Sequence, residues 1–269
     1  TTFWGWALGE AGELYVPCLT LVSMGVIGFI LAGFAIYQYF IEWSGFGGIL
    51  PFSGFAVGVG MEMLGPWFKG ASTGKSIWAG VFLLLWFNII VALITILIGV
   101  GCGMAGITVE VAPATEGNMI FPMAYIGGGI MCAVFQILFL LAQRVYKKTA
   151  PIHMLVFGWL MGAILAPTGL CGSMLAIFGQ GFGIMLPVGG YQMYTIGYLL
   201  AQGGAAASQG MAMLGAFALA ILGLFVTGLC TFLMYRANFD RKTPDQVHLE
   251  RAQAKEKHYS ALVAGEHAE

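Results

Sequence analysis

Glu62 is the residue of this chain whose type and position most clearly indicate chemistry in an apolar environment. It is the only residue charged at neutral pH within two segments rich in glycine and proline, 45–68 and 181–203. An intramembrane carboxylate costs at least about 2.5 kcal/mol unless it is paired, hydrated or protonated. Two interpretations are therefore open: Glu62 coordinates an ion or couples a proton, or its side chain extends to the membrane surface near Lys69.

Backbone groups at two chain breaks form the second set of candidates. Ser53 follows Pro51 and can cap a helix expected over about 55–65, while Pro187 precedes a similar helix expected over 191–202. Helix starts carry unpaired N–H groups and a positive dipole end, so two of them inside a bilayer favour an anion or oriented water. Besides Glu62, the predicted solute path comprises Pro51, Ser53, Gly54, Pro187, Gly189, Gly190, Gln192 and Thr195. The polar side chains among them are also compatible with an interfacial role.

Catalytic and cofactor-binding constellations are missing from the sequence. The five cysteines stand singly in apolar runs, without the spacing of a metal or redox site. The segment 70–76 resembles a nucleotide-binding loop but has three residues rather than four between its glycines. We therefore expect no metal, no cofactor and no self-contained active site. A place in an enzyme complex, as its membrane subunit, stays open.

The composition places these residues in a lipid bilayer. Of 269 residues, 59% are hydrophobic and 9% charged, and the mean hydropathy is +0.87. A soluble domain carries roughly a quarter of its residues charged, so a cytosolic enzyme is excluded. Twelve of the 23 charges lie in the last 34 residues, which leaves the body of the chain without a basis for binding nucleic acid.

Seven apolar runs are long enough to cross a hydrocarbon core of about 30 Å. They are 15–41, 45–68, 77–103, 119–143, 152–178, 181–203 and 209–235. The second and sixth open with glycine clusters and a proline, which a straight helix tolerates poorly. We predict that these two runs are broken.

The charges predict which connections face the cytoplasm, because basic residues in short loops stay on that side. The basic sets are Lys69 and Lys75; Arg144, Lys147 and Lys148; and Arg236, Arg241 and Lys242. Connections 1–14 and 104–118 contain glutamates but no lysine or arginine, and are predicted to lie outside. Three runs separate Lys148 from Arg236 although the chain must return to the same side, so one run must enter and leave on one face.

These observations predict an all-α polytopic membrane protein with five full spans and two re-entrant hairpins. Residues 45–55 and 181–191 share 6 identities in 11 positions, which supports an inverted repeat. The predicted units are 1–118 and 149–236, each span–hairpin–span, with a connecting span over 119–148 and a cytoplasmic tail over 237–269. A segment 243–246 resembling a capping box predicts a short helix in the tail, with a loosely ordered tail as the alternative.

The two breaks resemble segments of known membrane subunits. The segment 47–56, Gly-Gly-Ile-Leu-Pro-Phe-Ser-Gly-Phe-Ala, resembles a segment of the spore dipicolinate-channel membrane subunits, although Val57 stands where those proteins have asparagine. The segment 186–190 is similar to one in the membrane subunits of the sodium-translocating methyltetrahydromethanopterin methyltransferase. The resemblance implies a subunit of a membrane complex that passes an ion or small anion.

Two functions are consistent with the sequence. The first is a translocating subunit in the plasma membrane, with the N-terminus outside, the C-terminus cytoplasmic and other membrane subunits as partners. The second is a non-transporting scaffold that anchors a larger enzyme complex, with a soluble partner on the cytoplasmic tail.

Overall fold

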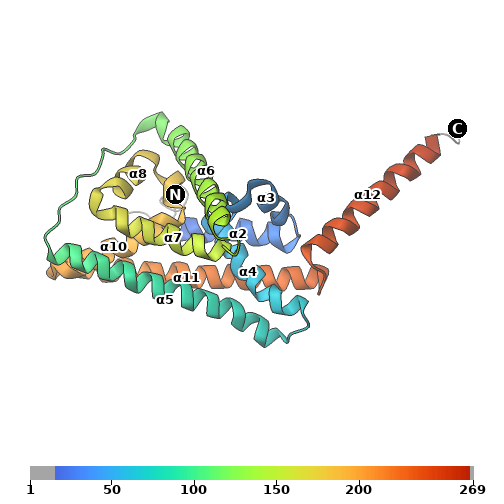
Figure 1. The fold of residues 1–269 in the computed structure, drawn as a ribbon, viewed down its shortest axis with the longest axis horizontal. Coiled ribbons are helices and arrows are strands. Elements are labelled where there is room, and N and C mark those ends of the chain that lie inside the picture. Colours follow the sequence, from blue (N-terminus) through green and yellow to red (C-terminus); the bar gives the residue numbers. More distant parts are fainter. Residues whose placement is uncertain (1–15, 267–269) are drawn as a thin grey trace.

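The computed structural model describes residues 16–266, with side chains from 19 onward except those of 180, 186 and 258–266, and contains only helices within that range. Two long helices, α5 (Thr73–Met104) and α11 (Gly204–Phe239), run lengthwise through the molecule (Figure 1). They run in opposite directions, because Arg236 near the end of α11 donates a 2.9 Å hydrogen bond to Thr73 at the start of α5. Together, α5 and α11 form a frame against which the shorter helices pack.

Four helical segments within the described range are long and apolar enough to cross a membrane. They are α5, α11, η3 with α6 (Gly117–Met119 and Ile120–Val145), and α7 with η4 (Pro151–Leu165 and Ala166–Thr168). A fifth span results if α2 (Val16–Gly33, from Leu19 onward) counts together with α3 (Tyr37–Ser44) and η2 (Gly45–Gly48), which are bent from it by 102°. The chain is therefore a polytopic helical membrane protein, as its composition predicts.

Two shorter helices, α4 (Phe52–Phe68) and α10 (Leu186–Gln202), pack against different halves of the frame. α4 packs on the first half of α5, where Gly80 faces Met63, and on the second half of α11. α10 packs on the opposite halves, where Gly99 faces the Tyr194 carbonyl and Gly210 faces Ile196. Each has 17 residues and rises about 26 Å, and neither lies along the whole frame.

The starts of α4 and α10 meet midway along the frame. Pro51, the residue before α4, pairs with Met185, the residue before α10, in an isolated antiparallel bridge. The Phe52 N–H donates to the Ile184 carbonyl over 3.3 Å. The two helices therefore begin side by side and extend toward opposite ends of the molecule.

Short helical segments lead the chain to each of these starts. α3 continues into η2 (Gly45–Gly48) before α4, and α8 (Leu170–Phe178) continues into α9 (Gln180–Gly183) before α10. The predicted uninterrupted spans 15–41 and 152–178 are wrong in their last thirds, because the chain turns at 34–36 and at 166–169. Ala35 (54°) and Gly169 (79°) have positive φ angles in these turns.

α6 covers both breaks from one side. Its Gln136 Oε1 accepts the Phe46 N–H at 2.6 Å, and its Cys132 thiol donates to the Gly47 carbonyl at 3.4 Å. Toward its start, Gly127 packs against the Phe178 ring and the Ala124 carbonyl lies against Gly181. The predicted connecting span therefore holds the two broken segments together.

The tail forms α12 (Pro244–Glu266), which projects from the bundle (Figure 1). The predicted capping box is confirmed: the Thr243 N–H donates to Gln246 Oε1 at 2.8 Å, and the Gln246 N–H to Thr243 Oγ1 at 3.4 Å. Arg251 donates to the carbonyls of Phe34 (2.6 Å) and Ala35 (3.3 Å), at the α2–α3 bend. The first turns of the tail thus stabilise a turn whose carbonyls have no helical partners.

Replacing Gly99 with alanine tests the close contact between α5 and α10. A methyl group there overlaps the Tyr194 carbonyl, so we expect Gly99→Ala to destabilise the protein by about 1–3 kcal/mol. Gly101→Ala on the same helix is the control, because no atom lies within 4 Å of its added methyl group. Thermal unfolding in detergent measures both, and equal melting temperatures for the two variants contradict this packing.

Candidate functional site

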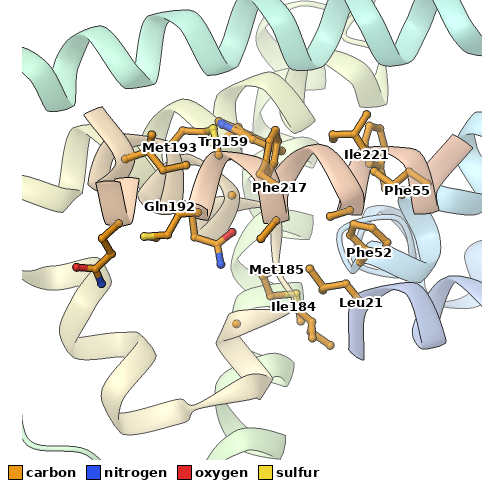
Figure 2. A pocket seen from close by; sticks show the side chains of 18 residues that line it. Leu21, Phe52, Phe55, Trp159, Ile184, Met185, Gln192, Met193, Phe217 and Ile221 are labelled. Carbon is orange, nitrogen blue, oxygen red and sulfur yellow. The ribbon is translucent and has the colours of Figure 1, made fainter. Parts of the chain in front are cut away.

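A cavity of about 460 Å³ lies beside the point where α4 and α10 begin (Figure 2). Its walls come from the starts of α4 and α10, from Trp159 of α7, from Leu21 of α2 and from the middle of α11. Ile184 and Met185 lie on the opposite side of it from Phe217 and Trp159 (Figure 2). The chain break thus leaves a partly open space rather than a fully packed core.

The walls of this cavity carry no formal charge among the described residues that line it. Most are aromatic, aliphatic or methionine side chains, and the polar side chains are the amides of Gln192 and Gln209. The indole N–H of Trp159, whose side chain also lines the cavity, is buried and has no hydrogen-bond partner among the described residues. Such a lining suits a solute bound through a few hydrogen bonds and apolar contact.

Glycines let the two breaks approach their neighbours at backbone distance. Gly54 lies against the Gly48 carbonyl, Gly190 against the Trp159 carbonyl, and Gly162 of α7 against the Pro187 carbonyl. A Cβ atom at any of these three positions overlaps a carbonyl oxygen. The glycine clusters that predict breaks in the sequence therefore act as packing surfaces around the cavity.

A buried tyrosine stabilises the first break. The Tyr37 hydroxyl donates to the Gly48 carbonyl at 3.0 Å and lies 3.3 Å from Ser53 Oγ. Ser53 does not cap α4 as predicted, because the helix begins at Phe52 and its N-cap is Pro51. The hydroxyl of Ser53 instead takes part in this buried pair.

The predicted path residues fall into three groups. Gly189 and Gln192 line the cavity. Pro51, Ser53, Gly54, Pro187 and Gly190 form the surrounding junction without lining it. Thr195 and Glu62 lie elsewhere: Thr195 is on the other face of α10, where its hydroxyl donates to the Tyr191 carbonyl at 2.9 Å, and Glu62 is exposed on α4.

A second, smaller cavity lies on that other face of α10. It measures about 330 Å³ and is lined by Tyr191, Tyr194, Tyr198 and Thr195 together with residues 107–109 of the connection after α5. Three hydrogen bonds tie this connection to α8: Ala112 N–H to Ser173 Oγ at 3.0 Å, Thr115 N–H to the Ala176 carbonyl at 3.1 Å, and Thr115 Oγ1 to the Ile177 carbonyl at 2.8 Å. α10 therefore separates two cavities.

Sequence reasoning missed most of the cavity wall. Trp159, Phe217 and Gln209 come from runs predicted as ordinary spans, and nothing in their local sequence distinguishes them from packing residues. Gln209 carries the one available signal, because it is a polar residue at the edge of an apolar run. The wall forms only when α7 and α11 pack beside the junction.

Comparison of the chain with protein families, curated proteins and solved structures finds no match. The predicted resemblance to spore and methanogen membrane subunits stays a prediction.

Replacing Tyr37 with phenylalanine tests the polar anchor of the first break. The variant leaves the buried Gly48 carbonyl and Ser53 hydroxyl without this partner, so we expect a loss of about 1–3 kcal/mol in stability. Tyr39→Phe is the matched control, because that ring is 44% exposed and stacks on His248 through its face. If chemical denaturation in detergent gives the same stability for both variants, the anchor is not stabilising.

Proposed function

We propose that the chain is a membrane subunit that passes a small solute, neutral or anionic, through the junction of α4 and α10. The observation that carries the proposal is the meeting of two helix starts midway along the frame, beside a cavity with uncharged walls. Helix starts offer N–H groups and a positive dipole end without a cationic side chain. A solute can therefore be attracted to the helix starts without being held by a full positive charge, so that it can leave again.

The element order supports an inverted repeat around this junction. α2, α3 with η2, α4 and α5 correspond to α7, α8 with α9, α10 and α11 in that order. The packing corresponds as well: α4 lies against α2, α5 and α11, while α10 lies against α7, α11 and α5. Membrane proteins with discontinuous helices in inverted repeats commonly place their solute site between the repeats.

Membrane depth follows from the frame. If α5 and α11 cross the bilayer, the bridge between Pro51 and Met185 lies near its centre, and the connections at 69–72 and 240–243 share one face. The positive charges of these connections make that face cytoplasmic. On this proposal both broken segments are re-entrant, the first from the cytoplasmic side and the second from outside.

Glu62 supports the proposal that other membrane subunits are present. Its side chain is exposed on α4, on a face that also includes Gly58 and Gly65, and an added Cβ at either glycine meets no atom within 4 Å. A carboxylate facing lipid costs at least about 2.5 kcal/mol, whereas a neighbouring helix can pair or hydrate it. We propose that this face of α4 contacts another subunit, which pairs or hydrates the Glu62 carboxylate away from the cavity.

A scaffold role is the second candidate, and the projecting helix α12 favours it. Beyond its first turns, α12 extends away from the bundle and offers a charged surface to a soluble partner (Figure 1). A scaffold needs no solute path, so filling the cavity discriminates between the two functions.

Filling the cavity with a tryptophan tests translocation. Ala220 of α11 lines the cavity and is 5% exposed, so Ala220→Trp blocks the space, and we expect solute flux to fall at least roughly tenfold. Release of trapped glycerol (neutral), chloride and dipicolinate (anionic), with sodium as the cation for comparison, measures the flux from proteoliposomes made with the protein and its co-purifying subunits.

The matched control is Leu222→Trp, two residues along α11 on an exposed surface (55% exposed). It adds the same side chain to the same helix without filling the cavity. Loss of flux in Ala220→Trp alone, with both variants still assembled, is the expected result. Undiminished release of every solute from Ala220→Trp vesicles, or no release from the unsubstituted complex, favours the scaffold.

A further inference from the structure

α4 and α11 end, and α5 begins, at one end of the bundle (Figure 1). Four cationic residues belong to these helix ends and their connections. Lys69 and Lys75 belong to the connection between α4 and α5 and to the first turn of α5. Arg236 lies in the last turn of α11, and Arg241 follows that helix. This end is distant from the cavity at the junction, and translocation as proposed makes no use of it.

A buried tryptophan holds the two arginines in place. Their guanidinium carbons lie 4.4 Å (Arg236) and 4.0 Å (Arg241) from the centre of the Trp67 ring. The ring is 7% exposed, and its N–H donates to the Asp240 carbonyl at 3.0 Å. The positive charges are therefore fixed by packing rather than free to move with solvent.

Each guanidinium retains most of its hydrogen-bonding capacity. Arg236 donates one hydrogen bond, to Thr73 Oγ1, and Arg241 donates one, to the Trp67 carbonyl at 2.8 Å, within the described part of the chain. A guanidinium has five N–H groups in a planar fork that matches phosphate oxygens. Both arginines can therefore bind an anion without breaking these contacts.

No carboxylate neutralises this cluster. Among the described side chains, none of the four cations has an acidic oxygen within 4.0 Å, whereas Lys242 pairs with Glu250 at 2.7 Å. The amines of both lysines make no hydrogen bond to the described chain and are exposed. Even with the exposed carboxylate of Asp240 in the same connection counted, the cluster keeps a net positive charge at the edge of the apolar frame.

An exposed apolar stripe begins directly beside the cluster. Lys75 is followed on the same face of α5 by Trp78, Phe82 and Trp86, which are 62%, 58% and 45% exposed. Spacings of three and four residues place these side chains one above another along the helix. A molecule with an anionic head and an apolar tail matches both the cationic cluster and the apolar stripe. A soluble phosphate contacts the cationic cluster alone.

We propose that this end of the bundle binds the phosphate headgroup of an anionic phospholipid, with an acyl chain lying along the exposed face of α5. Arg236 and Arg241 bind the phosphate oxygens, and the two lysines add attraction for anionic over zwitterionic lipid. The inference rests on the membrane embedding of α5 and α11, and it holds whether or not the chain translocates a solute.

Native mass spectrometry of the full-length protein in detergent tests the site directly. The probes are phosphatidylglycerol and phosphatidylcholine with identical acyl chains, and we expect the anionic lipid to bind at least roughly tenfold more tightly. Lys69→Gln with Lys75→Gln is expected to abolish most of that preference while leaving the fold intact, because neither amine contacts the rest of the described chain. Arg236→Gln with Arg241→Gln is expected to abolish the remainder.

The matched control is Lys147→Gln with Lys148→Gln, which removes two charges from the other basic connection, where no such tryptophan clamp is found among the described residues. Its lipid preference should equal that of the unsubstituted protein. Equal binding of the two lipids, or an equal loss of preference in the control and in the lysine pair at 69 and 75, overturns the proposal. Displacement of the lipid by millimolar inorganic phosphate also overturns it, because the site then recognises a soluble anion.

Discussion

The pairing of two chain breaks inside an apolar bundle is the interaction on which the rest of the structure depends. An unpaired backbone N–H or carbonyl in lipid costs several kcal/mol, so a helix can stop at membrane depth only where its freed groups find partners. Here the break before α4 and the break before α10 supply part of each other's partners, since Phe52 donates to Ile184 and Pro51 pairs with Met185. Tyr37 and Gln136 satisfy neighbouring groups from α3 and α6.

Close packing against the frame follows from that pairing. α4 and α10 each extend along only part of α5 and α11. Each is therefore held in position by contacts with the half of the frame that it covers. Glycines at those contacts, such as Gly99 against the Tyr194 carbonyl and Gly60 against the Gly228 carbonyl, bring backbone against backbone. The cavity remains where side chains of α7, α11 and the two helix starts do not fill the space beside the bridge. The meeting of the two helix starts midway along the frame thus accounts for both the close packing and the candidate site.

Local sequence predicted the features that depend on local chemistry. Proline and glycine at 51–54 and 187–190 marked the places where helices begin, and Thr243 with Gln246 marked the start of the tail helix. The bend at 34–36 was missed because Phe-Ala-Ile carries no turn signal and the turn is held from a distance by Arg251. The sequence also did not predict on which side of α4 Glu62 lies. Sequence spacing gives neither the start of α4 at Phe52 nor the helices that bury its other faces.

Cross-linking of the two breaks in intact membranes tests the central claim most directly. In a variant with no other cysteines, Phe52→Cys and Ile184→Cys place two thiols at the bridge, and the reference pair combines Ile184→Cys with Phe68→Cys at the far end of α4. Mild oxidation followed by mass spectrometry of the peptides should give an intramolecular disulfide for the first pair and none for the second. Absence of the 52–184 disulfide, or equal yields from the two pairs, contradicts the meeting of the two helix starts.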